Sequence, residues 1–167
     1  DGSIISESDF IMDNWYNTSV PNTVLSVMVQ NGVYEDIFMG DNFDKIPKEQ
    51  FEVPWWYRTS FNLDTKNRNQ NYQLIFEGLN YKANIWLNGK LIAGSEDVEG
   101  CFRIFDFHVT DQLRKGENVI ALEIIPPVLG DLTIGFVDWN PWPPDNNLGL
   151  WRPVKLLKSG PVSMRHV

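Results

Sequence analysis

The chain has 167 residues, of which 43% are hydrophobic, and its Gly and Pro contents are close to average, so disordered, collagen-like and low-complexity classes are excluded. Ala occurs only three times, against sixteen Asn and seven Trp, a balance that excludes a helical bundle and favours a mostly β domain. The formal net charge of −8 repels phosphate groups, so nucleic acid and anionic membranes are poor partners, whereas a neutral ligand such as a sugar is not excluded.

One segment near the start of the chain has the features of a helix. The expected helix covers residues 23–31, with Asn22 as its N-cap and Gly32 in the position that follows its end. Its apolar residues on a shared face are Val24, Val27 and Met28. We expect the helix to pack by this face and to have a purely structural role.

The rest of the chain alternates short strands with turns. Asn88-Gly89 is a strong hairpin signal, and Pro126-Pro127 ends strand pairing. About eight short strands in a chain of this length predict a two-sheet sandwich or a barrel. The clearest expected strands are 55–62, 72–78, 82–88, 90–94, 101–110, 118–125 and 152–160. The strand aromatics expected to serve the core are Phe61, Phe76, Trp86 and Phe105.

No local pattern carries a known catalytic or metal chemistry. A Gly-rich phosphate loop, a G-x-S-x-G turn and an H-E-x-x-H helix are all absent from the sequence. His108 and His166 are the only histidines and Cys101 is the only cysteine, so we expect neither a zinc site of the His and Cys type nor an internal disulfide. His108 lies in a strand pattern beside apolar residues, and we interpret it as structural. No spacing among the 22 acidic residues singles out a catalytic pair, so we assign no catalytic residue to this chain. We assign it no metal ligand and no cofactor either, and the sequence leaves open whether a cation binds.

One segment differs in composition from the rest of the chain. The sequence VDWNPWPPDNNLGLWRP, residues 137–153, contains three Trp, four Pro and two Asp. A Pro-rich loop is stiff and holds its side chains in place, and flat indole faces stack on sugar rings while Asp and Asn bind hydroxyl groups. The alternative interpretation is that these Trp side chains plug one end of the sandwich, and composition supports both equally.

At this loop the chain resembles the N-terminal sugar-binding domain of glycoside hydrolase family 2, in its exo-β-glucosaminidase and β-mannosidase branch. The resemblance covers nearly the whole chain and is strong because the motifs occur in the family's order. The segments that carry it are VPNTVLSVMVQNGVYEDIFMGDNFDKIP (20–47), PWWYRTSF (54–61), GLNYKANIWLNGKLIA (78–93), FRIFDFHVTDQLRKGENVIALEI (102–124) and GLWRPVKL (149–156). DWNPWPPDNNLGLWR favours the exo-glucosaminidase type over ordinary β-galactosidase.

The resemblance implies an all-β fold, a jelly-roll β-sandwich of the galactose-binding kind with one short helix, as a single domain over residues 1–167. In the family an immunoglobulin-like sandwich and a (β/α)₈ barrel follow, and both catalytic glutamates lie in the barrel. We therefore expect a non-catalytic domain, separated from the barrel of a retaining exo-β-glycosidase that is periplasmic or extracellular. Its expected partners are a terminal β-linked sugar and the remaining domains of that enzyme.

The resemblance also implies which residues face the sugar. Asp138 and Trp139 match the family's pocket-facing positions best, and the further candidates in the same loop are Trp142, Asp145 and Asn146. Two other functions stay open: an autonomous carbohydrate-binding module and a purely structural domain that braces the barrel. Of these, only the module is expected to bind sugar alone.

Overall fold

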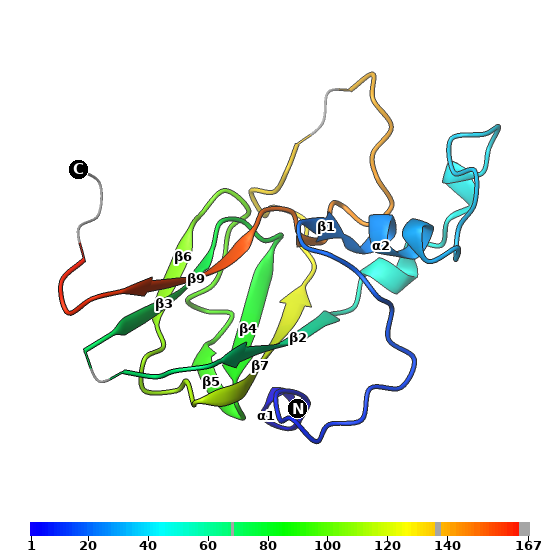
Figure 1. Cartoon of the computed structure of the whole chain (residues 1–167). Helices are drawn as coiled ribbons and strands as arrows, with labels where there is room; N and C mark the ends of the chain where they lie inside the picture. The colour runs from blue at the N-terminus through cyan, green and yellow to red at the C-terminus, as the bar shows by residue number, and fades with distance from the viewer. Residues whose placement is uncertain (68, 136–137, 164–167) are drawn as a thin grey trace.

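Two antiparallel β-sheets form the body of the domain (Figure 1), in a computed structural model that describes residues 1–67, 69–135 and 138–163. The helices are α1 (Gly2–Ile5), α2 (Val24–Gln30) and the 3₁₀ turns η1 (Phe43–Lys45) and η2 (Glu49–Phe51). The strands are β1 (Asn22–Thr23), β2 (Trp55–Leu63), β3 (Asn71–Phe76), β4 (Lys82–Leu87), β5 (Lys90–Ala93), β6 (Phe105–His108), β7 (Gly116–Ile125), β8 (Gly149–Leu150) and β9 (Val154–Ser159). Among the described residues, α2 alone is a helix longer than one turn.

The two sheets differ in size, and in both the spatial order of the strands differs from their order in the sequence. The larger sheet has the order β2-β7-β4-β5 and the smaller one β6-β3-β9, with antiparallel pairing throughout. A separate two-residue ladder joins β1 to β8. The predicted all-β sandwich with one short helix is confirmed.

The core lies between the sheets and is built by alternate residues of the strands, since successive strand residues point to opposite faces. The residues of β4 that face the core are Ala83, Ile85 and Leu87. Phe76 is fully buried and Phe105 is 6% exposed, while Phe61 is partly buried against the same cluster. These three aromatic residues serve the core as predicted.

The prediction for Trp86 is wrong, because its position in β4 places it on the outer face of the larger sheet. Its ring lies 5.4 Å from that of Trp56, measured between centroids. Gly2 of α1 covers the indole so closely that a Cβ at Gly2 would collide with it. Trp86 thus belongs to a small second layer between the sheet and the N-terminal segment.

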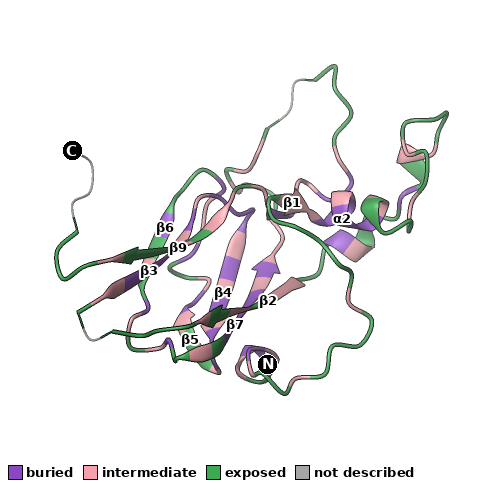
Figure 2. Ribbon diagram, in the orientation of Figure 1, coloured by how far each residue is buried: buried purple, intermediate pink, exposed green. Residues whose placement is uncertain are grey.

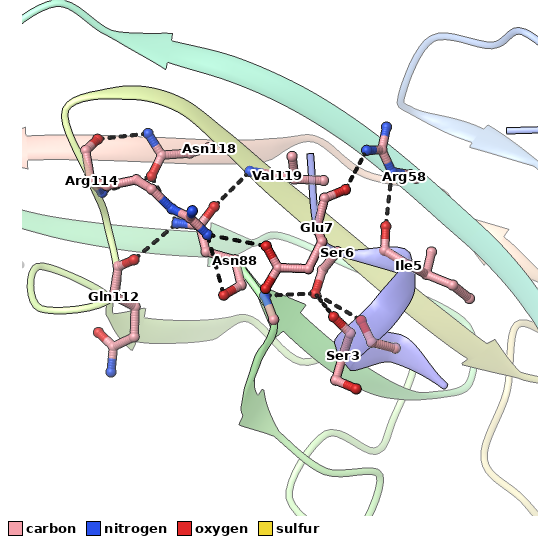
Figure 3. A network of polar contacts seen from close by, with 12 residues as sticks. Ser3, Ile5, Ser6, Glu7, Arg58, Asn88, Gln112, Arg114, Asn118 and Val119 are labelled. Atoms are coloured by element: carbon pink, nitrogen blue, oxygen red, sulfur yellow. Dashed lines mark hydrogen bonds and ion pairs between the residues drawn. The ribbon is translucent and has the colours of Figure 1, made fainter. Parts of the chain in front are cut away.

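The sequence did not predict α1. Polar contacts hold this helix against the outer face of the larger sheet (Figure 3). The Arg58 guanidinium donates to the carbonyl oxygens of Ile5 and Glu7, both at 2.9 Å. The backbone N–H of Gly89, in the β4–β5 turn, donates to Ser6 Oγ at 2.9 Å. Because these bonds join residues more than 40 positions apart, the first turn of the chain is part of the tertiary structure.

The predicted helix 23–31 is confirmed but is shorter by one residue at each end, since α2 covers Val24–Gln30. Thr23 is its N-cap and accepts a hydrogen bond from Ser26 N–H at 3.4 Å, while Asn22 pairs with Leu150 in the β1–β8 ladder. Gly32 follows the helix in a left-handed conformation, with φ of +71°, as its predicted position requires. The buried face of α2 consists of Val24, Leu25, Val27 and Met28.

Strand β6 is shorter than the predicted strand 101–110. Gly100 has a φ of +111°, which turns the chain away from the ladder before the strand begins. The carbonyl of Cys101 accepts a hydrogen bond from the Trp151 indole at 3.0 Å, so this group is not available to a neighbouring strand. Phe102 packs edge-on against the same indole, with ring centroids 5.8 Å apart.

Candidate functional site

Two long segments, residues 33–53 and 126–148, project from one end of the sandwich beside α2 (Figure 1). Residues 33–53 are mostly exposed, and among the described residues of 126–148 exposure is greatest at 128–130 and 138–142 (Figure 2). They meet at a hollow of about 90 Å³, lined by Lys48, Phe51, Glu52, Trp142, Pro143, Pro144 and Asn146. Because pockets that enclose a small ligand usually measure about 300–1,000 Å³, this hollow is too small to enclose such a ligand by itself.

The 33–53 segment contains a larger hollow of its own, of about 260 Å³. Its lining residues are Val33, Tyr34, Glu35, Ile37, Asn42, Lys45 and Ile46. Phe38 and Met39 near its rim are 86% and 66% exposed. This segment therefore offers apolar and charged groups side by side, next to the 126–148 loop.

Two of the predicted sugar-facing residues occupy the outer part of the 126–148 loop. Asp138 is exposed, and Trp139 has 80% of its surface open to solvent. Trp142 is half-exposed, and its indole N–H donates to Asn146 Oδ1. The structure thus brings Trp142 and Asn146 together in the 90 Å³ hollow and leaves Asp138 and Trp139 on the surface of the same loop.

Asp145 lies beneath these residues and is only 1% exposed. Its Oδ2 accepts a hydrogen bond from Leu25 N–H, in the first turn of α2, and its Oδ1 accepts one from Asn147 N–H, both at 2.9 Å. Burial raises the pKa of the Asp145 carboxyl above its usual value, while these hydrogen bonds oppose the rise. In the described domain this carboxylate fixes the loop to α2.

Asn80 was not predicted, although its side chain contacts both ends of the 126–148 loop. It is fully buried in the turn that leads into β4. Its Nδ2 donates to the carbonyl oxygens of Asn146 and Asn147, at 2.7 and 3.2 Å, and its Oδ1 accepts from Thr133 Oγ1 at 2.7 Å. The available signal was a lone amide between Leu79 and Tyr81, at the start of an apolar strand.

Comparison with known proteins gives the family. The family described as "glycosyl hydrolase 2 galactose-binding domain-like" matches residues 5–135, which is more than half of the chain. The chain belongs to this family. The predicted membership is thereby confirmed.

Relatives of this family 2 domain include exo-beta-D-glucosaminidases. That of Amycolatopsis orientalis is 37% identical over 166 residues, which cover 99% of this chain and 16% of the relative. That of Streptomyces avermitilis is 38% identical over 163 residues, with 96% and 18% covered. The match to these relatives includes the 138–146 region that lies beyond the family's matched residues.

Solved structures agree with this relationship. The A. orientalis exo-chitosanase has a TM-score of 0.90 at 37% identity, over 96% of this chain and 19% of that protein. A β-D-mannosidase from Dictyoglomus thermophilum has a TM-score of 0.70 at 26% identity, over 90% and 21%. The family 2 domain therefore spans about a fifth or less of the relatives it matches, and corresponds to their N-terminal domain region.

The remaining candidate groups of this family 2 domain form no further site among its described residues. His108 is exposed on β6, with its Nε2 3.3 Å from Gln73 Nε2, and Cys101 is buried with its Sγ 3.3 Å from the Leu132 carbonyl. His166 lies outside the described residues. Within residues 1–67, 69–135 and 138–163, no three His, Cys, Asp or Glu side chains are grouped as metal ligands, and no helix is long and apolar enough to cross a membrane.

Proposed function

We propose that this chain is the non-catalytic N-terminal domain of a retaining exo-β-glycosidase, in which it braces the catalytic barrel and supplies the 126–148 loop to the sugar pocket. The observation that carries the proposal is that the candidate residues of this loop differ in burial. Asp138 and Trp139 are exposed at its surface, while Asp145 is buried and hydrogen-bonded at its base. A carboxylate and an indole held on an anchored loop form a suitable wall for a sugar.

The distribution of charge supports an amine-bearing sugar as the ligand. Residues 33–53 contain six acidic and two basic side chains, and residues 126–148 contain three acidic side chains and no basic one. These two segments thus carry −7 of the formal net charge of −8, and the rest of the chain is nearly neutral. Such a field attracts a protonated amine toward the end of the sandwich where both segments lie. The relatives' name, exo-beta-D-glucosaminidase, is consistent with this preference.

Exposed apolar side chains support the bracing role. Phe102, Ile104, Leu129 and Leu132 are each between 63% and 106% exposed. The hydrogen bond between Cys101 Sγ and the Leu132 carbonyl joins the backbone next to Phe102 to that of Leu132. Because exposed apolar side chains that gather on a surface mark interaction sites, we assign Phe102 and Leu132, whose backbones this bond brings near each other, to contact with the barrel of the parent enzyme.

The proposal is tested by Asp138→Ala in the full-length enzyme. A hydrogen bond to a charged group contributes roughly 1.5–3 kcal/mol, so we expect kcat/KM to fall by about 10- to 150-fold. Glu117→Ala is the matched control, because Glu117 is an exposed carboxylate at the start of β7, at the far end of the sandwich. Equal activity of Asp138→Ala and the wild type would contradict the sugar contact and favour a purely structural domain.

An autonomous carbohydrate-binding module is the second candidate, because the same exposed Trp139 could serve as a stacking platform. Titration of the isolated domain with glucosamine oligomers separates the two functions. We expect no hydrolysis and only weak binding, since one wall encloses little of a ligand's surface. Micromolar binding by the isolated domain would favour the module.

A further inference from the structure

The side chain of Asn80 has its hydrogen-bonding groups directed at the 126–148 loop. Its amide oxygen accepts from Thr133 Oγ1, in the part of the loop that leaves β7, and its amide nitrogen donates to the carbonyls of Asn146 and Asn147, in the part that enters β8. Its backbone also exchanges two hydrogen bonds with Gly149, at 2.9 and 3.1 Å. One buried residue therefore ties the outgoing and returning ends of a long loop together.

This tie extends to the exposed aromatic side chain of the loop. The carbonyl of Asn146 accepts from Asn80, and the side-chain oxygen of Asn146 accepts from the Trp142 indole. Asn146 has a φ of +48°, a left-handed conformation in which both groups are held at once. Asn80 thus acts on the orientation of Trp142 through a single intermediate residue.

A carboxamide suits this position better than the other side chains of its size. It offers two N–H donors and an acceptor at one point, whereas a carboxylate has no donor and an apolar side chain leaves the Asn146 and Asn147 carbonyls unpaired. An unsatisfied buried polar group is costly, so loss of the amide favours opening of the loop. Asp145 fixes the same loop to α2 at a second point.

We propose that Asn80 is a positioning residue, whose buried carboxamide closes the base of the 126–148 loop and, through Asn146, sets the orientation of Trp142. The link from this positioning to sugar turnover rests on the proposed function. The positioning itself does not, because it concerns contacts within the domain.

The test compares Asn80→Ala with Asn118→Ala in the full-length enzyme. Asn118 is an equally buried asparagine, whose Nδ2 donates to the Arg114 carbonyl at 2.8 Å (Figure 3). It also donates to the Gly116 carbonyl at 2.9 Å, and its Oδ1 accepts from Arg114 N–H at 2.8 Å. It bonds to Asn88, beyond the opposite end of β4 from Asn80. Both variants lose a comparable set of buried hydrogen bonds, so a general loss of stability affects both alike.

The first measurement is amide hydrogen exchange in peptides that cover residues 145–150. We expect exchange there to accelerate on the order of tenfold more in Asn80→Ala than in Asn118→Ala, whose general loss of stability sets the baseline. Thr133→Val keeps the amide of Asn80 and removes only the hydroxyl donor, so its faster exchange should be confined to residues 131–135. If Asn80→Ala does not fold, Asn80→Asp replaces it: the carboxylate keeps an acceptor for Thr133 and lacks the donors to the Asn146 and Asn147 carbonyls, so faster exchange in residues 145–150 is expected of this variant too. Unchanged exchange in the loop, or equal acceleration in the Asn118 control, would overturn the positioning role.

The second measurement is a double-mutant cycle on kcat/KM with Asn80→Ala and Trp142→Ala. If Asn80 acts through Trp142, the two losses will not add, and the double variant will resemble the worse single one. Full additivity would overturn the route through Trp142. Failure of the proposed function is recognised separately, since Asp138→Ala would then retain full activity whatever the exchange measurements show.

Discussion

Asp145→Ala is expected to destabilise the domain strongly, because it removes the acceptor of one buried and one partly buried N–H group. Leu25 and Asn147 each donate to this carboxylate at 2.9 Å, and the side chain is 1% exposed. A hydrogen bond to a charged group contributes roughly 1.5–3 kcal/mol, and neighbouring losses do not add fully, so we expect about 2–4 kcal/mol in total. For a domain of this size each kcal/mol lowers Tm by about 2–4 °C, which gives a decrease of roughly 4–16 °C.

Thermal unfolding followed by circular dichroism is the assay, with Asp138→Ala as the control from the same loop. Asp138 is exposed, so its removal should leave Tm within a degree or two of the wild type. The two variants then separate the proposed roles of the loop: we expect Asp145→Ala to lower stability and Asp138→Ala to lower activity of the full-length enzyme. An unchanged Tm in Asp145→Ala would refute the anchoring role of this carboxylate.

The pH dependence of stability gives a second check on Asp145. Burial raises the pKa of this carboxyl in the folded state, so the folded protein holds the proton more tightly than the unfolded chain, whose Asp pKa is about 3.9. The stability that this group contributes is therefore fully present below that value and is lost as pH rises through the folded pKa. Asp145→Asn does not titrate, so the excess stability of the wild type over this variant should shrink from pH 4 to pH 7. A gap that widens over this range would show that the folded pKa is lowered instead.

Two further predictions concern the packing of the sheets. Phe76→Ala should lower the free energy of unfolding in urea by roughly 3–5 kcal/mol, because this side chain is fully buried. Phe102→Ala, at a residue that is 63% exposed, should lower it by less than about 1 kcal/mol. Equal losses in the two variants would contradict the core assignment. Gly2→Ala should displace α1 from Trp86, because the added methyl group collides with the indole, and faster amide exchange at Ile5 and Ser6 should report the displacement. Gly160→Ala is the control, because a Cβ added there meets nothing within 4 Å and the backbone φ is not positive. Unchanged protection of Ile5 and Ser6 in Gly2→Ala would contradict this packing.

The sheets could be predicted because their signals are local and repeated. Alternation of apolar residues and turn residues such as Asn88-Gly89 placed seven strands within a few positions of their observed bounds. The same alternation gave the wrong face for Trp86. Hydrophobicity alone does not distinguish the core face of a sheet from an outer face that a second layer of the chain covers. That layer is α1, and its four residues are too few to show a helical period.

The candidate loop was found by composition, but the roles of its acidic residues could not be. Asp138 and Asp145 are seven positions apart in one Pro-rich segment, and nothing local distinguishes them. They differ because the backbone N–H of Leu25 in α2, 120 positions away from Asp145 in the sequence, donates a hydrogen bond to Asp145. Asn80 was missed for the same reason, since its partners lie 53 to 67 positions further along the chain.

The pairing of β9 with β3 affects where this kind of domain can be cut. The family's matched residues end at 135, yet β3 lies between β6 and β9, and β9 begins only at Val154. A fragment trimmed to the matched residues would turn the middle strand of the smaller sheet into an open edge, with the N–H and C=O groups of Asn71–Phe76 on that side unpaired. Such an edge is a template for pairing with another copy, so the shorter fragment is prone to aggregate. The smallest unit that folds cleanly therefore extends at least through Ser159, some way past the boundary that the family comparison suggests.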